Sequence, residues 1–99
     1  MPKYRIGPKA GQDLEEIWSY IAGDNPDAAN KFIETLLDLF DRISENPGIG
    51  RARPGFAKGV FLLPHRRYRI AYKLHEDTVV VLRVVHSRRQ LSSEDYFDS

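Results

Sequence analysis

Cationic side chains gather in one stretch of the chain, residues 66–89, where a histidine also stands near the end. Lysine and arginine on one accessible surface bind phosphate groups or acidic protein surfaces through their charge. A solvated charged face without a partner is the alternative interpretation. We expect this stretch to hold the working surface. Its candidate residues are Arg66, Arg67, Arg69, Lys73, Arg83, His86, Arg88 and Arg89.

The distribution of charge along the chain supports that interpretation. The net charge is only +1, but residues 1–50 carry nine acidic and five basic side chains. Residues 51–99 carry ten basic and five acidic ones, and up to residue 89 only Glu76 and Asp77 oppose those ten. Such polarity favours an acidic or polyanionic partner for the second half of the chain.

Several other chemistries fit the sequence poorly. The chain has no cysteine, which excludes disulfides and thiolate metal sites. His65, His75 and His86 are placed at expected strand ends, and none has a second ligand four residues away on a helix. No Gly-x-Ser-x-Gly motif indicates a hydrolase. We therefore expect neither a metal nor a cofactor.

Two amphipathic helices are expected in the first half. Residues 8–22 carry an apolar stripe at helical spacing, and Gly23 to Pro26 interrupts it. Asn25 followed by Pro26 predicts a second helix start, which extends to about Glu45. The short connection predicts an antiparallel helical hairpin. The two stripes are Ala10, Leu14, Ile17, Trp18 and Ile21, and Ala29, Phe32, Ile33, Leu36, Leu37, Phe40 and Ile43.

Short strands are expected on either side of these helices. Residues 4–6 form a brief first strand, and the glycines and prolines of residues 47–59 predict a loop. Three further strands cover residues 60–63, 67–74 and 78–85. Pro64 ends the first of these three, and His75-Glu76-Asp77 turns between the last two.

The order predicts one α+β domain over residues 1–99, β-α-α-β-β-β, with the helical hairpin packed on one face of a mostly antiparallel sheet. The sets expected to face the helices are Tyr68, Ile70 and Tyr72, and Val80, Leu82 and Val84. The other face is then open and cationic, with Arg69, Lys73 and Arg83. Because the tyrosines lie opposite the arginines, a stacking platform for single-stranded nucleic acid is not expected, nor is direct sequence-specific nucleic-acid binding.

Four segments in this order resemble the ParE branch of the RelE/ParE toxin superfamily. They are the DLEEIWSYI run from Asp13, the NPGIG run from Asn46, the RYRIAY run from Arg67 and the VLRVVHSRR run from Val81. The resemblance spans nearly the whole chain. It implies the α+β fold described above and one of two activities: RelE-like members cut messenger RNA on the ribosome, and ParE-like members poison DNA gyrase.

The resemblance also allows the residues of this chain to be compared with the catalytic residues of RelE-like nucleases. RelE-like nucleases carry a pair of lysines whose positions fall on about Val60 and Leu62 here, and neither side chain stabilises an anion. If the chain were a nuclease, Arg69, His86 and Arg88 would be its catalytic residues, while Tyr96 is spaced too far from Arg88. We therefore expect a gyrase poison without catalytic residues. A RelE-like endoribonuclease and an inactive chain that only binds antitoxin are the alternatives.

The partners expected from the resemblance are proteins. A ParD-like antitoxin, encoded beside the toxin, would lay a helix and an extended segment over apolar grooves and meet the cations of residues 66–89. DNA gyrase is the expected target, and a toxin dimer within the antitoxin complex is allowed. The chain lacks a signal-peptide core and an apolar run long enough for a bilayer, so a cytoplasmic protein with no membrane partner is expected.

Overall fold

A computed structural model of the chain describes residues 4–52 and 58–89. Residues 53–57 of the expected loop, and the tail from residue 90 with Tyr96, lie outside the described residues. The elements in chain order are β1 (Tyr4–Ile6), α1 (Pro8–Ala22), α2 (Pro26–Glu45), the 3₁₀ helix η1 (Pro47–Ile49), β2 (Arg51–Ala52), β3 (Val60–His65), β4 (Tyr68–His75) and β5 (Thr78–His86).

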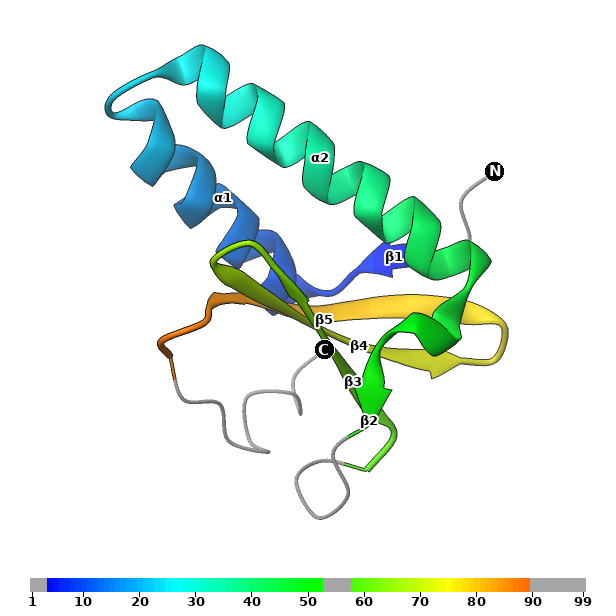
Figure 1. The fold of residues 1–99 in the computed structure, drawn as a ribbon. Coiled ribbons are helices and arrows are strands. Elements are labelled where there is room, and N and C mark those ends of the chain that lie inside the picture. Colours follow the sequence, from blue (N-terminus) through cyan, green and yellow to red (C-terminus); the bar gives the residue numbers. More distant parts are fainter. Residues whose placement is uncertain (1–3, 53–57, 90–99) are drawn as a thin grey trace.

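The helices α1 and α2 form the expected antiparallel hairpin (Figure 1). Both begin at a proline, which is tolerated there because the first helical N–H has no partner within the helix. The Asn25 side chain caps α2 by accepting a hydrogen bond from the Ala28 backbone N–H at 3.1 Å. Across the hairpin, Trp18 Nε1 donates to Asn30 Oδ1 at 2.8 Å. The helical half of the prediction is confirmed.

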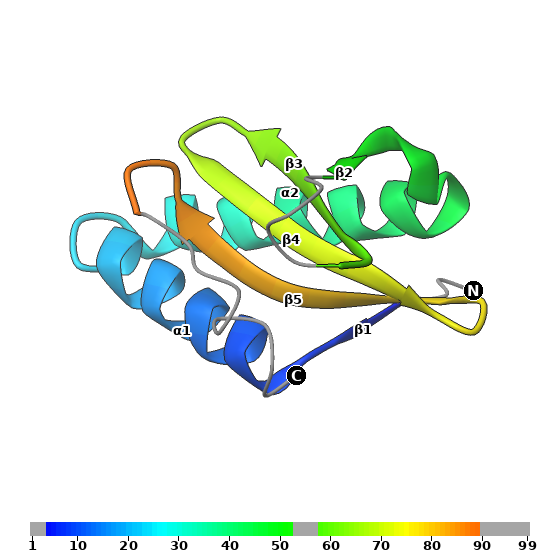
Figure 2. The ribbon, with the colours of Figure 1, turned by 90° about the horizontal axis from the view of Figure 1, so that it is seen from below.

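The sheet that the hairpin covers has five strands within the described residues, in the order β1-β5-β4-β3-β2. β1 runs parallel to β5, and the other neighbours are antiparallel. Figure 2 shows β5 and β4 as the long central strands. The short β1 lies beside the first part of β5, and α1 lies beside the rest of that strand. The α+β class with helices on one face is confirmed, and the 3₁₀ helix and β2 are additions within the expected loop.

The main core lies between the hairpin and the sheet. Leu36, Phe40 and Ile43 of α2 are fully buried, and Ile70 and Tyr72 of β4 are equally buried beneath the helices. Removing such side chains from water is the dominant stabilising term for a domain of this size. The three remaining main-core residues from the sheet are Val79, Val81 and Val84.

The alternation expected for β5 is wrong in its first half. Val80 and Leu82 do not join the helix-facing core but form a second buried cluster with Val60, Leu62 and Ala71 on the other face. A β-bulge is the reason: Ala71 pairs with Arg83 and Tyr72 pairs with Val81, so Leu82 is an extra residue. Period-two counting over the whole strand shifts residues before the bulge to the wrong face.

The end of β3 also differs from the expectation. Pro64 does not stop the strand, which continues to His65 with Pro64 opposite Arg69. β2 pairs with Phe61 and Leu62 only, so Pro64 stands where β3 has no neighbour on its outer side among the described residues. A strand edge tolerates proline because no partner needs its missing N–H.

Candidate functional site

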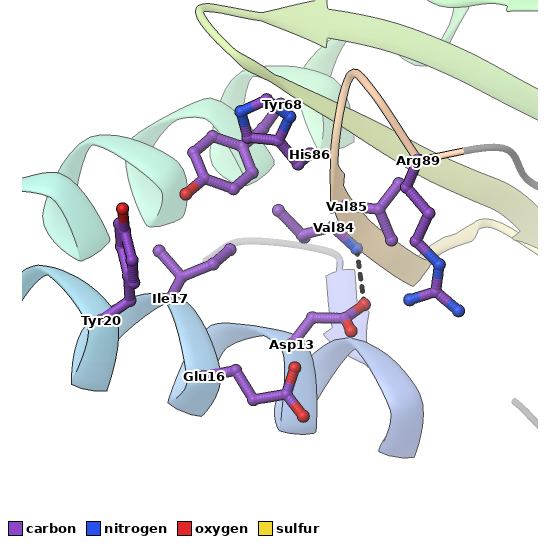
Figure 3. A pocket seen from close by; sticks show the side chains of 9 residues that line it. All are labelled: Asp13, Glu16, Ile17, Tyr20, Tyr68, Val84, Val85, His86 and Arg89. Carbon is purple, nitrogen blue, oxygen red and sulfur yellow. Dashed lines mark hydrogen bonds between the residues drawn. The ribbon is translucent and has the colours of Figure 1, made fainter.

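Asp13 of α1 anchors the helix to the edge of β5. Backbone pairing of β1 with β5 ends at Val81, whose carbonyl accepts from the Gly7 N–H at 2.9 Å. Farther along the same strand the Asp13 carboxylate replaces a neighbouring strand, because its Oδ2 accepts from the Val84 N–H at 2.9 Å (Figure 3). An edge N–H that would otherwise be buried without a partner is thereby satisfied.

Arg83 completes this anchor. Its Nε donates to Asp13 Oδ2 at 2.8 Å and its Nη2 to Asp13 Oδ1 at 3.0 Å, a two-point ion pair. Arg83 is only 6% exposed. The expectation that Arg83 lies on an open cationic face is therefore wrong: a buried guanidinium needs a carboxylate partner, and the bulged strand brings it to α1.

Four exposed arginines of the candidate set gather at one end of the sheet. Arg66 and Arg67 form the β3–β4 turn, and Arg88 and Arg89 follow β5. The two turns lie together because Tyr68 pairs with both His65 and His86, and because the Ser87 N–H donates to the Arg67 carbonyl at 2.7 Å. Figure 2 shows both turns at the same end of the sheet. We call these four arginines the cationic end.

Arg69, Lys73 and His86 lie in different positions relative to the cationic end. The half-buried Arg69 adjoins the cationic end, since its Nη2 donates to the Arg89 carbonyl, and its buried Nε has no partner among the described residues. Lys73 stands four residues farther along β4, about 13 Å away at the rise of a strand, toward the opposite end. Arg69 and Lys73 flank Ala71 on the face away from the helices, as predicted, but Arg83 does not join them, and the middle of that face is apolar and buried.

His86 is held by its neighbours rather than left free. Its Nδ1 accepts from the Arg88 N–H at 3.2 Å, so the proton of the neutral ring lies on Nε2. Its ring packs edge-on against Tyr68, with the centroids 5.6 Å apart. This arrangement places a donor nitrogen next to the cationic end, which suits binding of an acidic group as well as proton transfer.

A small pocket of about 190 Å³ opens between α1 and the end of β5 (Figure 3). Glu16, Tyr20 and Tyr68 lie around it, and His86 and Arg89 also line it. Burial, and next the nearby Tyr20, raise the pKa of the Tyr68 hydroxyl above its ordinary value, so it remains a donor. The Asp13 carboxylate is already engaged by Arg83 and Val84 and does not offer the pocket a free base.

The NPGIG segment has a structural role. The Tyr72 hydroxyl donates to the Pro47 carbonyl at 2.7 Å and accepts from the Gly50 N–H at 2.8 Å. A Cβ at Gly50 would lie 2.4 Å from that hydroxyl, so only glycine fits. Burial raises the pKa of the Tyr72 hydroxyl, and the Gly50 N–H opposes this rise. Tyr72 thus ties the end of α2 to β4.

Sequence reasoning missed Asp13, Tyr68 and Glu16 as parts of this region. A signal for Asp13 was present, because it falls between Ala10 and Ile17 at helical spacing on the buried stripe, where a charge needs a partner. Within residues 4–52 and 58–89, no group of three or more histidine and acidic side chains could hold a metal ion. In the same residues no helix is long and apolar enough to cross a membrane.

Comparison with solved structures identifies the class of fold. The chain superposes on a chain from "Chromosomal ParDE TA system from P. aeruginosa" with a TM-score of 0.72, covering 87% of this chain and 96% of that one. The sequence identity is 20%, so this likeness concerns the fold alone. The two chains share one α+β architecture, a helical hairpin on one face of a mostly antiparallel sheet.

Sequence comparison then gives the family. A model described as the ParE toxin of the type II toxin–antitoxin system parDE matches residues 4–91. Toxin ParE1 of Mycobacterium tuberculosis is 35% identical over 92 residues, covering 87% of this chain and 90% of that protein. Toxin RelE3 of Caulobacter vibrioides is 24% identical over 88% of this chain and 96% of its own length. This chain belongs to the ParE toxin family, as its motifs predicted, and is the toxin of a type II system.

Proposed function

We propose that this toxin acts by inhibiting DNA gyrase and is neutralised by a ParD-like antitoxin. The cationic end, with Arg69 and His86, is the surface we assign to these partners. Membership in a toxin–antitoxin family supports an antitoxin partner. Docking through the cationic end needs no reacting group, and complementary charge would increase the rate of encounter with an acidic protein surface.

The observation that carries the choice of target is the character of β3. Val60 and Leu62 are 6% and 8% exposed and belong to the second apolar cluster. RNA cleavage develops negative charge in the transition state, which cations near the reacting phosphate must stabilise. Two buried aliphatic side chains cannot do this, and replacing either with lysine would place a charge in an apolar cluster.

Gyrase inhibition can be measured directly. Purified toxin added to gyrase and relaxed plasmid should reduce supercoiling or accumulate cleaved DNA, and premixing with antitoxin should abolish the effect. Lack of any effect on gyrase at a large excess of toxin would contradict the proposed target. Growth arrest on expression without antitoxin separates an active toxin from a chain that retains only antitoxin binding.

A ribosome-dependent endoribonuclease is the second candidate. One observation favours it: Arg69, His86 and Arg88 meet at one end of the sheet, where the imidazole Nε2 carries a proton. In a translating system with a defined message, a nuclease would give cuts at fixed codon positions that disappear in His86→Ala and Arg69→Ala. An uncut message would exclude this candidate.

A further inference from the structure

The cationic end presents its guanidinium groups within a short distance of one another. Tyr68 of β4 pairs with His65 of β3 on one side and with His86 of β5 on the other. Three neighbouring strands span about 10 Å at their usual spacing, so the two turns attach all the arginines of this end within about that width. Duplex DNA carries one negative charge per about 1.7 Å of its axis, which gives about six charges over the same length. The positive charge density here therefore approaches the negative charge density of a nucleic-acid backbone.

The side chains beside the cationic end leave most of this charge in place. The two turns, residues 65–68 and 86–89, contain no acidic side chain. Lys31 of α2 lines a pocket with Arg66 and adds to the charge, whereas Glu16 of α1 lines a pocket with Arg89 and reduces it. A protein surface usually mixes both signs of charge. A cluster of one sign therefore suits a ligand that is uniformly anionic.

Both turns are held in place by hydrogen bonds. The Ser87 N–H donates to the Arg67 carbonyl at 2.7 Å and joins one turn to the other. The Arg89 N–H donates to the His86 carbonyl at 2.9 Å and closes the second turn. Arg69 Nη2 donates to the Arg89 carbonyl and holds that turn beside β4. The arginines are thus presented from a fixed backbone, and a ligand needs to order only their side chains.

The polar side chains that reach solvent at the cationic end can donate hydrogen bonds. A guanidinium group has donors only, and its planar fork matches two oxygens of a phosphate group. The neutral His86 ring presents its Nε2–H, because its Nδ1 accepts from the Arg88 N–H at 3.2 Å. The exposed Ser87 hydroxyl can add a further donor. Phosphate oxygens accept hydrogen bonds, so they are complementary to this surface in both charge and hydrogen bonding.

The rings near the cationic end are not arranged to read bases. Tyr68 packs its ring against Phe32, with centroids 5.5 Å apart, and against His86, with centroids 5.6 Å apart. Tyr20 is exposed on α1 and lines a pocket with Arg89, but successive bases need several rings in a row. The surface therefore suits a duplex, whose bases remain stacked, better than a single strand.

An acidic stripe along the solvent side of α2 restricts how a duplex can approach. Its side chains recur at spacings of three, four and seven residues and so share one face of the helix. Lys31 stands among them, at the end of the helix nearer Arg66. Phosphates repel this stripe, so the toxin meets a duplex with its cationic end. The stripe consists of Asp27, Glu34, Asp38, Asp41 and Glu45.

We propose that the cationic end binds the phosphate backbone of a nucleic-acid duplex, independently of its sequence. The inference rests on the proposed function only for which duplex is bound, the DNA that gyrase holds. A toxin that contacts this DNA as well as the enzyme joins the two, which suits a poison that accumulates cleaved DNA. The arginines supply the charge, and the hydrogen-bonded turns hold them in position.

The test uses the full chain and a short labelled DNA duplex, without gyrase. Arg67→Gln/Arg88→Gln removes two exposed guanidinium groups and keeps the backbone hydrogen bonds of both turns. Its matched control, Arg51→Gln/Lys58→Gln, removes two exposed charges from β2 and from the residues before β3, away from the two turns. Fluorescence anisotropy at several salt concentrations gives the affinity and its salt dependence, and circular dichroism checks that each variant is folded.

Three or four phosphate contacts predict a slope of about −3 to −4 for the logarithm of the affinity against the logarithm of the salt concentration. Arg67→Gln/Arg88→Gln should make this slope shallower by about 2 and weaken binding at low salt at least about tenfold. The control should keep the slope of the parent and most of its affinity. Equal losses in the two double variants, or an affinity that does not depend on salt, would overturn the inference.

Two further ligands separate the alternative partners. A polyglutamate peptide that binds as tightly as the duplex would assign the surface to acidic proteins and overturn the inference. An RNA duplex of the same sequence that binds at least about tenfold more tightly, about 1.4 kcal/mol, would overturn the assignment to DNA. A toxin that binds DNA but leaves gyrase active contradicts the proposed target and leaves the duplex site assigned. Inhibition of gyrase by a toxin that does not bind DNA refutes the duplex site and leaves the proposed target.

Discussion

Asp13 and Arg83 stand 70 positions apart in the chain and meet in a buried two-point ion pair. The same carboxylate accepts the Val84 N–H, so one side chain joins α1 to both the backbone and the side chain of β5. The pair connects the first and last of the motifs that identify the family. It therefore holds in place the strand that carries His86 and leads into the cationic end.

Asp13→Ala should lower the free energy of unfolding by about 3 kcal/mol or more, because it leaves a buried guanidinium without its counter-charge. Urea unfolding followed by circular dichroism measures the loss. The double variant Asp13→Leu/Arg83→Met should recover only part of it, since the Val84 N–H remains without an acceptor. Glu15→Gln, an exposed neighbour, is the control. An unchanged denaturation midpoint for Asp13→Ala would show that the pair does not stabilise the fold.

Gly50→Ala should destabilise the chain by about 1–3 kcal/mol, because its Cβ would overlap the Tyr72 hydroxyl and force the 3₁₀ segment away. Gly50 has a φ of −79°, which any residue adopts, so the effect is steric and not conformational. Gly48→Ala is the matched control, since its nearest neighbour would lie 3.9 Å away. Thermal unfolding of both variants tests this, and equal melting temperatures would contradict it.

Reversing charge at the cationic end should slow antitoxin binding. For Arg67→Glu/Arg88→Glu we expect the association rate at low salt to fall about tenfold or more, because complementary charge steers encounter. The difference from the parent should shrink as salt screens these exposed groups. Stopped-flow mixing at several salt concentrations measures both effects. Lys73→Glu, toward the other end of β4, is the control and should lower the association rate less. An equal fall in the association rate for Lys73→Glu would argue against a surface localised at the cationic end.

Acid should destabilise the fold through His65. Burial first, and then Arg66 and Arg42, lower the pKa of His65 below its ordinary value of 6.5. The unfolded chain then binds a proton more readily, so this contribution to stability is present above pH 6.5 and is lost as the pH falls through the folded pKa. Urea unfolding at pH 7.5 and below pH 6 should show a smaller pH dependence for His65→Gln than for the parent. His75→Gln, in an exposed position, is the control. Parallel pH profiles for the parent and His65→Gln would refute this.

Local chemistry was sufficient to place the helices and most strands. The Asn25–Pro26 start, the apolar stripes and the turn at Glu76 depend on neighbours within a few residues, and the structure has each of them. The β-bulge at Leu82 escaped the pattern because pairing with Ala71 and Tyr72 creates it, not the local sequence of β5. Pro64 was taken as a strand end because the sequence does not show that β2 leaves this edge unpaired.

The sequence by itself determined the family, the fold class and the concentration of arginines near the end of the chain. Only the tertiary structure separated those arginines and Lys73 from one another. Arg83 is buried against Asp13, Lys73 lies toward the far end of β4, and the others meet where two turns adjoin. The physical reason is that burial and ion pairing depend on contacts between residues far apart in the chain, whereas composition and periodicity report only on residues close in sequence.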